Sequence, residues 1–295
     1  MHIALASCHP LPEPDPDEAP LLLALREAGH HAQTIVWTDH SADLSAFDAI
    51  VIRATWDYHR AADAFLAWTS RAAAQSHLLN SPDVVRWNAH KSYLADLEQR
   101  GVPIVPTHWI AQGNPSELSA VLVQKQWRDF VIKPAISCGS FRCGRFNTEE
   151  LDDANALLRT ITQDGDAMVQ PYVRSIERGG ERAIVWIDGT VTHVAAKSPR
   201  FHGADESIPE VRAPREDESA FARDVIDAAG FRDLLFARID VMLDDQGAFM
   251  LSELELIEPS LYFPKWPAAL PLMVRGIERR VAGAARSRQP SSRGE

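Results

Sequence analysis

Four charged side chains alternate along two neighbouring stretches in the segment 236–260. These stretches flank the residues 244–247, Asp-Asp-Gln-Gly, which predicts a β-hairpin with a four-residue loop. In that register residue 243 faces 248, 240 faces 251 and 238 faces 253, and opposed side chains share a face. One face then carries Arg238, Asp240, Glu253 and Glu255. The other face suits a core, with Ala237, Ile239, Val241 and Leu243 against Ala248, Met250, Ser252, Leu254 and Leu256.

Three carboxylates on one face repel one another unless a cation lies between them. Oxygen-only ligands suit Mg2+, which commonly bridges carboxylates to substrate phosphates. In an arbitrary hairpin, a solvated face with scattered charges is the commoner explanation. The flanking Glu258-Pro-Ser260 and two lysines elsewhere in the chain favour a binding site here.

Those two lysines are candidates to hold phosphate groups. Lys133 ends the apolar stretch 130–133 and precedes a loop of small residues that includes Ser137 and Gly139. A lysine facing a loop of free backbone amides is typical of nucleotide phosphate sites. Lysines at strand ends are usually only solvated, but Lys91 provides a second candidate at a predicted domain boundary. We therefore expect both lysines to converge on one triphosphate.

The segment 169–173 joins a strand to irregular chain at Pro171, which leaves neighbouring backbone groups outside any ladder. Such groups at an interdomain hinge can bind an adenine edge, although an ordinary strand-ending proline would look the same. Gln170, Pro171, Tyr172 and Val173 are the residues concerned. A carboxylate that could reach a ribose hydroxyl follows, either Glu177 or Glu181, and the sequence does not choose between them.

A second predicted hairpin turns at Asp188 and Gly189, with residue 187 facing 190. That register places Arg182, His193 and Lys197 on one face, where Arg182 and Lys197 would add positive charge for phosphates or a substrate carboxylate. The following segment, 198–209, contains Gly203 and several polar residues and resembles a lid.

The N-terminal residues alternate between strands and helices, with strands at 3–6, 33–37 and 49–52 and helices at 19–28 and 61–74. This order predicts a small parallel sheet, whose ligands bind beyond the carboxyl ends of the strands. Two segments lie there, 7–17 and 53–58, and Arg53, Trp56, Asp57 and Tyr58 of the second suit an amino-acid-like ligand. Alternatively, Trp56 and Tyr58 cap the core of this unit.

Further along, we expect helices at 84–100, 115–124, 148–162 and 268–285, strands at 104–107, 130–133, 168–170, 182–187 and 190–196, and a disordered tail at 286–295. The 295 residues allow two or three domains. We expect an N-terminal α/β domain at 1–85, a central subdomain at 86–166 and a C-terminal metal- and substrate-binding subdomain at 167–285.

Composition excludes several classes of protein. The net charge of −11 argues against a nucleic-acid partner, and no apolar run approaches the ~20 residues of a membrane span. The first residues lack a basic region typical of a signal peptide, so a cytoplasmic location is expected. The three cysteines, Cys8, Cys138 and Cys143, make neither a disulfide framework nor a convincing zinc site.

Over residues 80–285, the ordered motifs resemble the ATP-grasp superfamily, in its glutathione synthetase-like and D-alanine:D-alanine ligase-like branch. In closer detail they resemble the enzymes related to O-ureido-D-serine cyclo-ligase, which closes the D-cycloserine ring. The motifs are Arg53-x-Thr-Trp-Asp-Tyr58, Asn88-x-x-Lys91-x-Tyr93, Val169-Gln-Pro-Tyr172, Gly180-Glu181 with His193-x-x-x-Lys197, and Glu253-Leu-Glu-Leu-Ile-Glu-Pro-Ser260.

This resemblance implies an ATP-grasp fold that holds ATP between two α+β subdomains behind an N-terminal parallel α/β domain. It implies that Lys91 and Lys133 bind ATP phosphates, that residues 170–173 bind adenine, and that Asp240, Glu253 and Glu255 bind one or two Mg2+ ions, for which Mn2+ can substitute. Arg238 and backbone amides near Ser260 would stabilise charge on the reacting carboxylate, and Glu258 is assigned to the substrate. Glu255 stands where relatives often have Asn, and Cys138, Phe141 and Cys143 make the phosphate loop poorer in glycine.

The implied activity is an ATP-dependent carboxylate–amine ligase that activates a small amino-acid-derived carboxylate as an acyl phosphate. Ring closure within one molecule and the joining of two molecules, as in dipeptide or glutathione synthesis, both remain open, as does a homodimer. A nucleotide-binding regulatory protein is the alternative from another class, but the intact lysines and carboxylates argue against it.

Overall fold

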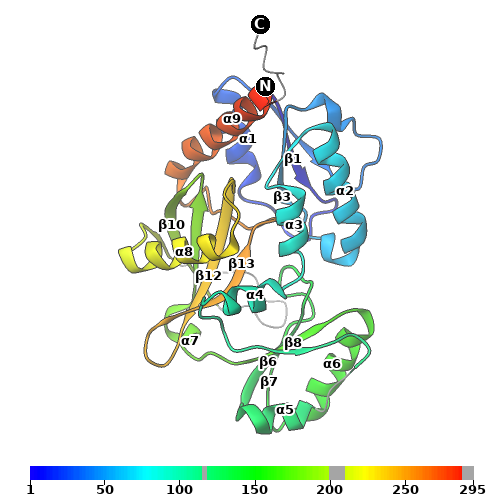
Figure 1. Ribbon diagram of the computed structural model, residues 1–295, viewed down its shortest axis with the longest axis vertical. Helices are drawn as coiled ribbons and strands as arrows, with labels where there is room; N and C mark the ends of the chain where they lie inside the picture. Colours follow the sequence, from blue (N-terminus) through cyan, green and yellow to red (C-terminus); the bar gives the residue numbers. More distant parts are fainter. Residues whose placement is uncertain (115–117, 199–209, 288–295) are drawn as a thin grey trace, which may run out of the picture.

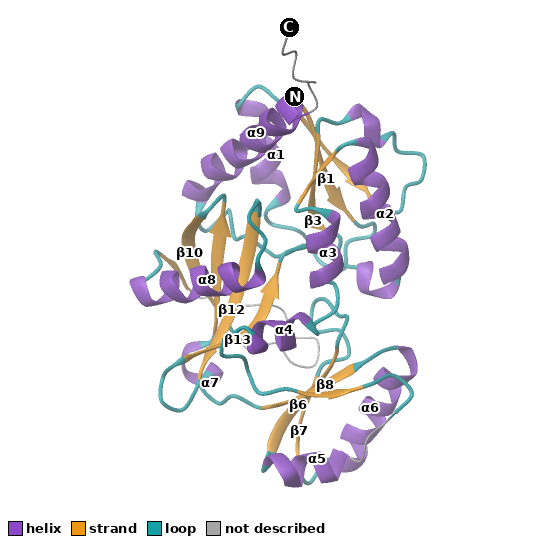
Figure 2. Cartoon of the chain, viewed as in Figure 1, coloured by secondary structure: helices purple, strands orange, loops and turns teal. Residues whose placement is uncertain are grey.

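The computed structural model describes residues 1–114, 118–198 and 210–287 of the chain. Its strands form three separate sheets with helices packed against them (Figures 1 and 2). This mixed α/β architecture is the fold class that the sequence predicts. Among the described residues, no helix is long and apolar enough to cross a membrane.

The N-terminal sheet is parallel and has the strand order β2-β1-β3-β4. Its strands are β1 (His2–Ser7), β2 (His31–Val36), β3 (Ala49–Ala54) and β4 (His77–Leu79), joined through α1 (Glu18–Glu27), α2 (Ala62–Gln75) and the short 3-10 helices Leu44–Ala46 and Tyr58–Arg60. Every residue of β3 is buried, as expected of a parallel strand covered on both faces. The carboxyl ends of β1 and β3 lead into the segments 8–17 and 55–61.

The second sheet is antiparallel and has the order β5-β8-β6-β7. Its strands are β5 (His108–Ile110), β6 (Asp129–Pro134), β7 (Gly144–Asn147) and β8 (Ala167–Pro171), and helices α5 (Leu118–Lys125) and α6 (Leu151–Asp164) supply the apolar side chains that pack on it. Strand β6 ends at Lys133 and Pro134, so the loop 135–143 leaves the sheet where the sequence places a phosphate site.

The third sheet is also antiparallel and has the order β11-β10-β9-β12-β13. Its strands are β9 (Glu181–Ile187), β10 (Thr190–Lys197), β11 (Glu210–Arg212), β12 (Phe236–Leu243) and β13 (Phe249–Glu255), and α7 (Ile176–Gly179) precedes them. One face packs against α8 (Glu216–Ala229), through side chains such as Ile184, Ile239 and Val225. The other face begins at Phe236 in a core shared with the N-terminal sheet and reaches the cavity described below at Asp240.

The chain ends with α9 (Leu270–Ser287), after the 3-10 helix Pro267–Ala269. Its residues Met273 and Ile277 are buried in the same cluster as Leu21 and Leu25 of α1, and in Figure 1 the two helices run close together. The N-terminal and C-terminal parts of the chain therefore share one hydrophobic core.

Several predicted elements differ from the structure. The helix expected at 84–100 is two helices, α3 (Pro82–Asn88) and α4 (Tyr93–Gln99), because the backbone N–H of Lys91 donates to the carbonyl of Ala135. The strand expected at 104–107 lies at β5, while Ile104 forms only a bridge to Leu251. Strands β4, β7 and β11 and helices α7 and α8 were not predicted.

The two remaining expectations fall largely outside the described residues. The predicted lid at 198–209 lies beyond them except for Ser198. The tail predicted from residue 286 begins two residues too early, because α9 extends to Ser287, and the remaining residues are not described.

Candidate active site

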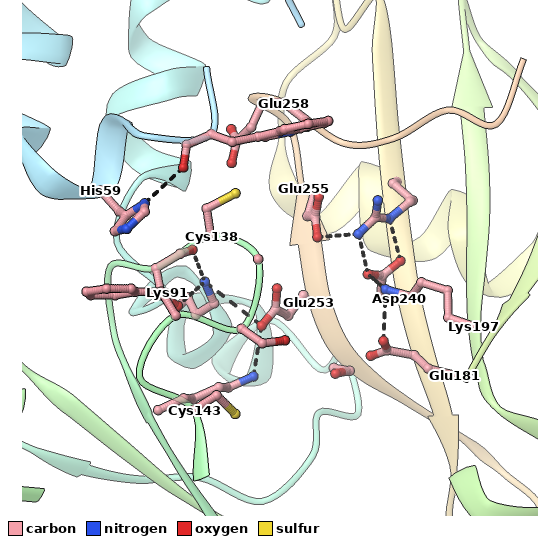
Figure 3. A pocket seen from close by; sticks show the side chains of 18 of the residues that line it. His59, Lys91, Cys138, Cys143, Glu181, Lys197, Asp240, Glu253, Glu255 and Glu258 are labelled. Atoms are coloured by element: carbon pink, nitrogen blue, oxygen red, sulfur yellow. Dashed lines mark hydrogen bonds and ion pairs between the residues drawn. The ribbon is translucent and has the colours of Figure 1, made fainter. Parts of the chain in front are cut away.

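A cavity of about 550 Å3 lies among the loops that follow β3 and β6, the end of β8 and the charged face of the β12–β13 hairpin. All of the predicted site residues line it except Arg53, Arg182 and Glu177. Side chains that are far apart in the sequence therefore meet around one cavity (Figure 3). Cavities of this size commonly hold small molecules.

The β12–β13 hairpin carries the acidic face, as the alternation predicts, but its register differs. Arg238 pairs with Glu255 and Asp240 with Glu253, so the predicted pairings of 238 with 253 and 240 with 251 are wrong by two residues. One residue comes from the turn, where Leu243 faces Phe249, and the second from a β-bulge at Ser252. Because side chains alternate with a period of two residues, a total shift of two leaves the four charged residues on the same face.

The same bulge corrects the predicted core face of the hairpin. Between the turn and the bulge, Leu251 is fully buried in the core that includes α8. Ser252, at the bulge, and Met242 line the cavity. Ser252 and Met250 were expected in the core, but the bulge turns this part of the strand over.

Lys133 and Lys91 approach Glu253 from the second sheet and from the α3–α4 break. Lys133 Nζ lies 2.8 Å from Glu253 Oε1, and Lys91 Nζ lies 3.9 Å from the same atom. Burial opposes ionisation of Glu253, but the two ammonium groups outweigh it and hold the pKa of Glu253 far below its usual value. Lys91 Nζ also donates to the carbonyl oxygen of Ser137 at 3.0 Å, which connects it to the loop after β6.

Asp240 is 1 % exposed and both of its oxygens are engaged. Lys197 Nζ donates to Oδ2 at 2.5 Å, and Arg238 donates to Oδ1 and Oδ2 at 2.9 Å each. Burial would raise the pKa of Asp240, but Arg238 and Lys197 hold it below the usual value. Lys197 also forms an ion pair with Glu181 at 2.8 Å.

Glu255 and Glu258 differ from the other two carboxylates because their surroundings favour the neutral form. Burial raises the pKa of Glu255 to about 7, with Asp240 and Glu253 adding to the rise and Arg238 opposing it. Burial and the charge of Glu255 raise the pKa of Glu258 to about 8. Four carboxyl groups in one cavity therefore span several pKa units, which is characteristic of functional sites.

The three predicted metal ligands do not form a ready cage. Within the described part of the chain, no group of three or more His, Cys, Asp or Glu side chains is arranged to hold a metal ion. Mg2+, however, is usually bound by one or two carboxylates together with substrate phosphates. Glu253 and Glu255 fit that requirement best, because their side chains are 22 % and 26 % exposed and each uses only one oxygen in an ion pair. Asp240 would first have to release Lys197 or Arg238.

The loop after β6 borders the cavity opposite the hairpin. Ser137, Cys138 and Gly139 line the space, and Gly139, Ser140 and Arg142 have positive φ angles of 59°, 60° and 51°. This conformation is usual for glycine but uncommon for Ser and Arg. The loop thus adopts left-handed backbone conformations at Ser140 and Arg142 although these residues are not glycine.

Gln170, Pro171, Tyr172 and Val173 line the cavity at the end of β8, where an adenine-binding segment is expected. The Gln170 side chain donates to Thr107 Oγ1 at 2.9 Å, and the Arg145 guanidinium lies 3.5 Å from the centre of the Tyr172 ring. Of the two ribose candidates, Glu181 lines the cavity, whereas Glu177 lies outside it and accepts a hydrogen bond from the Tyr172 hydroxyl at 3.0 Å.

Arg182 does not belong to the cavity, contrary to expectation. A bulge in the β9–β10 pairing places it opposite Ala196, on the face that packs against α8, while Lys197 faces the cavity opposite Glu181. Its guanidinium lies 3.6 Å from Glu218 of α8 and 5.5 Å from the centre of the Phe249 ring. The structure therefore places Arg182 against α8 and away from the cavity where a catalytic role was predicted.

Arg53 also lies away from the cavity, where the sequence predicts a contact with the substrate. Its side chain is only 2 % exposed, does not line the cavity, and donates to the carbonyl of Pro259 at 2.8 Å. It lies 3.6 Å from buried Asp17, which accepts hydrogen bonds from the backbone N–H groups of Leu261, Tyr262 and Phe263. Arg53 and Asp17 thus anchor the segment 259–263, which contains Ser260 and directly follows Glu258.

The other N-terminal candidates do line the cavity. Trp56 Nε1 donates to the carbonyl of Glu258 at 3.1 Å, and the Asp57 carboxylate accepts from Trp37 Nε1 at 2.7 Å. Tyr58 packs on Phe65 within the N-terminal core and also borders the cavity. It therefore has both of the positions that the sequence leaves open, one in the core and one at the site.

The cavity lining includes further residues that were not singled out as site candidates, namely Pro10, Leu11, Pro12, Glu13, His59, Arg60 and Phe141. The first four lie in the segment 7–17 after β1, which the sequence places beyond the carboxyl end of a strand, where ligands of parallel sheets bind. His59 directly follows the Arg53–Tyr58 motif, but a single histidine outside a motif does not indicate a site.

Known proteins resemble this chain over most of its length. Residues 3–80 match the family described as D-cycloserine synthetase DcsG, N-terminal domain. The cycloserine biosynthesis protein DcsG of Streptomyces lavendulae is 32 % identical over 263 residues, which cover 84 % of this chain and 88 % of that protein.

Two solved structures show the extent of the fold. The crystal structure of D-cycloserine synthetase DcsG aligns with a TM-score of 0.88 at 29 % identity, over 95 % of this chain and all of that one. The ATP-grasp ligase PsnB, complexed with a minimal precursor, Mg and ADP, aligns with a TM-score of 0.62 at 15 % identity, over 94 % of this chain and 97 % of that one. The second likeness concerns the fold alone.

Proposed function

This chain belongs to the DcsG family of D-cycloserine synthetases within the ATP-grasp ligases, and we propose that it closes a ring within one small amino-acid derivative. The protein is an ATP-dependent enzyme that joins a carboxylate to a nitrogen and uses ATP and Mg2+. The proposed substrate is O-ureido-D-serine or a close analogue. The observation that carries the proposal is the single cavity, in which phosphate-binding lysines, carboxylates and the N-terminal loops meet.

Lys91 and Lys133 are proposed to hold the ATP phosphates together with the loop that contains Ser137 and Gly139. Both ammonium groups converge on Glu253 Oε1, so they can reach a common anionic group between the second sheet and the hairpin. The adenine would lie against residues 170–173, and Glu181 is the nearer candidate for the ribose because it lines the cavity.

Glu253 and Glu255 are proposed as the principal Mg2+ ligands, with Asp240 joining them on release of Lys197. Their carboxylate oxygens suit Mg2+, and Mn2+ would be accepted by the same donors. One or two bound ions would neutralise phosphate charge while the γ-phosphoryl group is transferred to the substrate carboxylate.

Arg238 is proposed to stabilise the charge that develops on the acyl phosphate and during nitrogen attack. It is held by Asp240 and Glu255, and its Nη1 lies 3.4 Å from the carbonyl oxygen of Ser260, so the guanidinium is oriented before the substrate binds. A donor fixed in this way costs no reorganisation during the reaction. Lys197 adds a second positive charge on the same face.

The small substrate would lie between Trp56, Asp57 and Glu258, on the N-terminal side of the cavity. A volume of about 550 Å3 suits a nucleotide with a small molecule better than a nucleotide with a peptide. This favours a small substrate over the peptide ligation that the sequence leaves open.

The test is phosphate release from Mg-ATP with O-ureido-D-serine, O-ureido-L-serine, or pairs of amino acids, followed by mass spectrometry of the products. We expect release with O-ureido-D-serine alone and a ring-closed product. Release that requires two different amino acids would indicate an intermolecular ligase, and ATP binding without any release would indicate a regulatory protein.

A further inference from the structure

One end of the cavity carries two buried polar atoms without hydrogen-bond partners, Glu258 Oε2 and His59 Nε2. Figure 3 shows His59, Cys138 and Glu258 on the same side of the pocket, away from Lys197 and Glu181. They come from the 3-10 helix Tyr58–Arg60, the loop after β6 and the segment after β13. The phosphate and metal contacts proposed above use none of the three.

Glu258 is 9 % exposed, so its unpartnered oxygen is desolvated without compensation from the protein. The Cys138 thiol contacts the same carboxyl, and Trp56 Nε1 fixes the Glu258 backbone. Because burial and Glu255 raise its pKa to about 8, the carboxyl exists in both protonation states near neutral pH. A group with this pKa can take up a proton and release it again in each catalytic cycle.

His59 complements Glu258 as a neutral hydrogen-bond acceptor. Its Nδ1 lies 3.1 Å from the carbonyl oxygen of Trp56, which assigns the proton to Nδ1 and leaves a lone pair on Nε2. Burial and the neighbouring Arg60 lower the pKa of His59, which keeps the ring neutral. The ring packs on Phe141 with 4.7 Å between centroids, so the imidazole is held in place.

We propose that Glu258 and His59 form the subsite for the nucleophilic nitrogen of the substrate, and that the Glu258 carboxylate takes the proton which this nitrogen loses. His59 Nε2 and, in the ionised form of Glu258, its Oε2 are acceptors, so they fit a nitrogen that carries hydrogens. This inference rests on the proposed ligase function and assigns the nitrogen to one end of its cavity.

The C–N bond-forming step, which leaves the rest of the ureido group on the ring, balances with the substrate and ATP alone. As the nitrogen attacks the acyl phosphate, the new C–N bond forms, the bond between the acyl carbon and the phosphate oxygen breaks, and phosphate leaves with the electron pair. The N–H proton passes to Glu258 and then to solvent. A ureido nitrogen is weakly basic because its lone pair is delocalised into the carbonyl group, so it needs a proton acceptor during attack.

The test separates carboxylate activation from nitrogen attack in the variant Glu258→Gln. Enzyme, Mg-ATP and O-ureido-D-serine are incubated with and without hydroxylamine, a neutral nucleophile that traps acyl phosphates as hydroxamates without a base. We expect hydroxamate formation to stay within a few-fold of wild type, while ring-closed product falls by roughly 10²-fold or more. Asp245→Asn, which alters an exposed carboxylate in the turn of the β12–β13 hairpin, should leave the ratio of the two products unchanged.

His59 is tested with two variants that differ in one acceptor. His59→Gln can place an amide oxygen near the Nε2 position, whereas the shorter His59→Asn cannot. We expect His59→Asn to raise the KM for O-ureido-D-serine several-fold with nucleotide affinity unchanged, and His59→Gln to recover much of that loss.

Equal loss of hydroxamate and ring-closed product in Glu258→Gln would overturn the proposal, because Glu258 would then act in activation or in folding. Wild-type ring closure in this variant would overturn it as well. If the wild-type enzyme forms neither product, the proposed function fails first, and this inference fails with it.

Discussion

The cavity pairs each of its principal cations with a carboxylate of the protein, and Lys133 with Glu253 is the clearest case. Leaving one buried charge without a partner is strongly destabilising. A phosphate oxygen can replace Glu253 as the partner of Lys133, and Mg2+ can replace Lys133 as the partner of Glu253. An exchange of this kind keeps both charges compensated, so binding of ATP and binding of Mg2+ should depend on each other.

Glu253→Gln tests this exchange because it removes the charge and keeps the shape. We expect the variant to lose most ATP turnover and to require a much higher Mg2+ concentration, since a proposed metal ligand is lost. Mg2+ titration of phosphate release measures both effects. Asp245→Asn in the exposed turn of the same hairpin is the control, and wild-type turnover in Glu253→Gln would refute the metal assignment.

Arg238 tests whether the fixed guanidinium acts on the transition state. Arg238→Ala should lower kcat by about 10²–10³-fold, the usual effect of removing one such donor, with a smaller change in the KM for ATP. Arg238→Lys should recover little, because an ammonium group cannot bind Asp240 and Glu255 as a planar fork. A change confined to KM would contradict this role.

At the scale of elements, β13 is the edge strand of its sheet. Its outer side is covered by a short backbone bridge from Ile104 to Leu251 and, further along, by side chains. Asn88 Nδ2 donates to the carbonyl of Leu254 at 2.7 Å, and its Oδ1 accepts from the N–H of Leu256 at 2.8 Å. The Tyr93 hydroxyl accepts from the N–H of Leu254 at 3.0 Å. The α3–α4 segment therefore supports the strand that carries Glu253 and Glu255 while it presents Lys91 to the cavity.

Asn88→Ala should lower the free energy of unfolding by about 1–3 kcal/mol, because the Leu254 carbonyl in β13 and the Leu256 N–H just after this strand lose their partner. Urea denaturation measures this loss, and the apparent Mg2+ affinity should fall in parallel. In the matched control Asn155→Ala, the amide contacts only its own helix, and a change no larger than about 0.5 kcal/mol is expected. Equal effects in both variants would show that β13 does not depend on Asn88.

How far the sequence predicts these elements depends on the range of the contacts involved. The charged hairpin face follows from the two-residue period alone, whereas its register depends on the bulge at Ser252, which no local residue announces. The break at Lys91 arises from a hydrogen bond to Ala135, 44 positions along the chain. Helix α8 did have local signals, since Glu218 accepts from the Arg215 N–H and Gly230 ends the helix with φ 81°.

At the scale of the molecule, the two ends of the chain meet. The N-terminal sheet shares a core with α9 and the third sheet, and buried Asp17 holds the backbone of residues 261–263. The proposed nucleotide side and the proposed substrate side are thus joined by packing and not only by the chain. Arg53 could not be assigned from sequence because its partners, Asp17 and Pro259, lie far from it in the chain.

Asp188 provides a pH-dependent test of the packing of α9 against the third sheet. It lies in the β9–β10 turn and forms ion pairs with Arg279 and Arg280 of α9, the latter at 2.6 Å. Burial would raise the pKa of Asp188, but the two arginines outweigh it and hold the pKa below the ordinary value of 3.8. A carboxyl whose folded pKa is lowered adds stability above its unfolded pKa and loses it as the pH falls through the folded pKa.

We therefore expect Asp188→Asn to unfold at a lower urea concentration than wild type at pH 7, by about 1–3 kcal/mol, because two charge-assisted hydrogen bonds are weakened. The difference should remain constant down to about pH 5 and shrink as the pH falls below 4, where protonation of Asp188 makes the wild type resemble the variant. Asp245→Asn, an exposed turn residue, should show no such difference at any pH. A difference between Asp188→Asn and wild type that persists undiminished at pH 3 would mean that the contact between the turn and α9 depends on shape instead of charge.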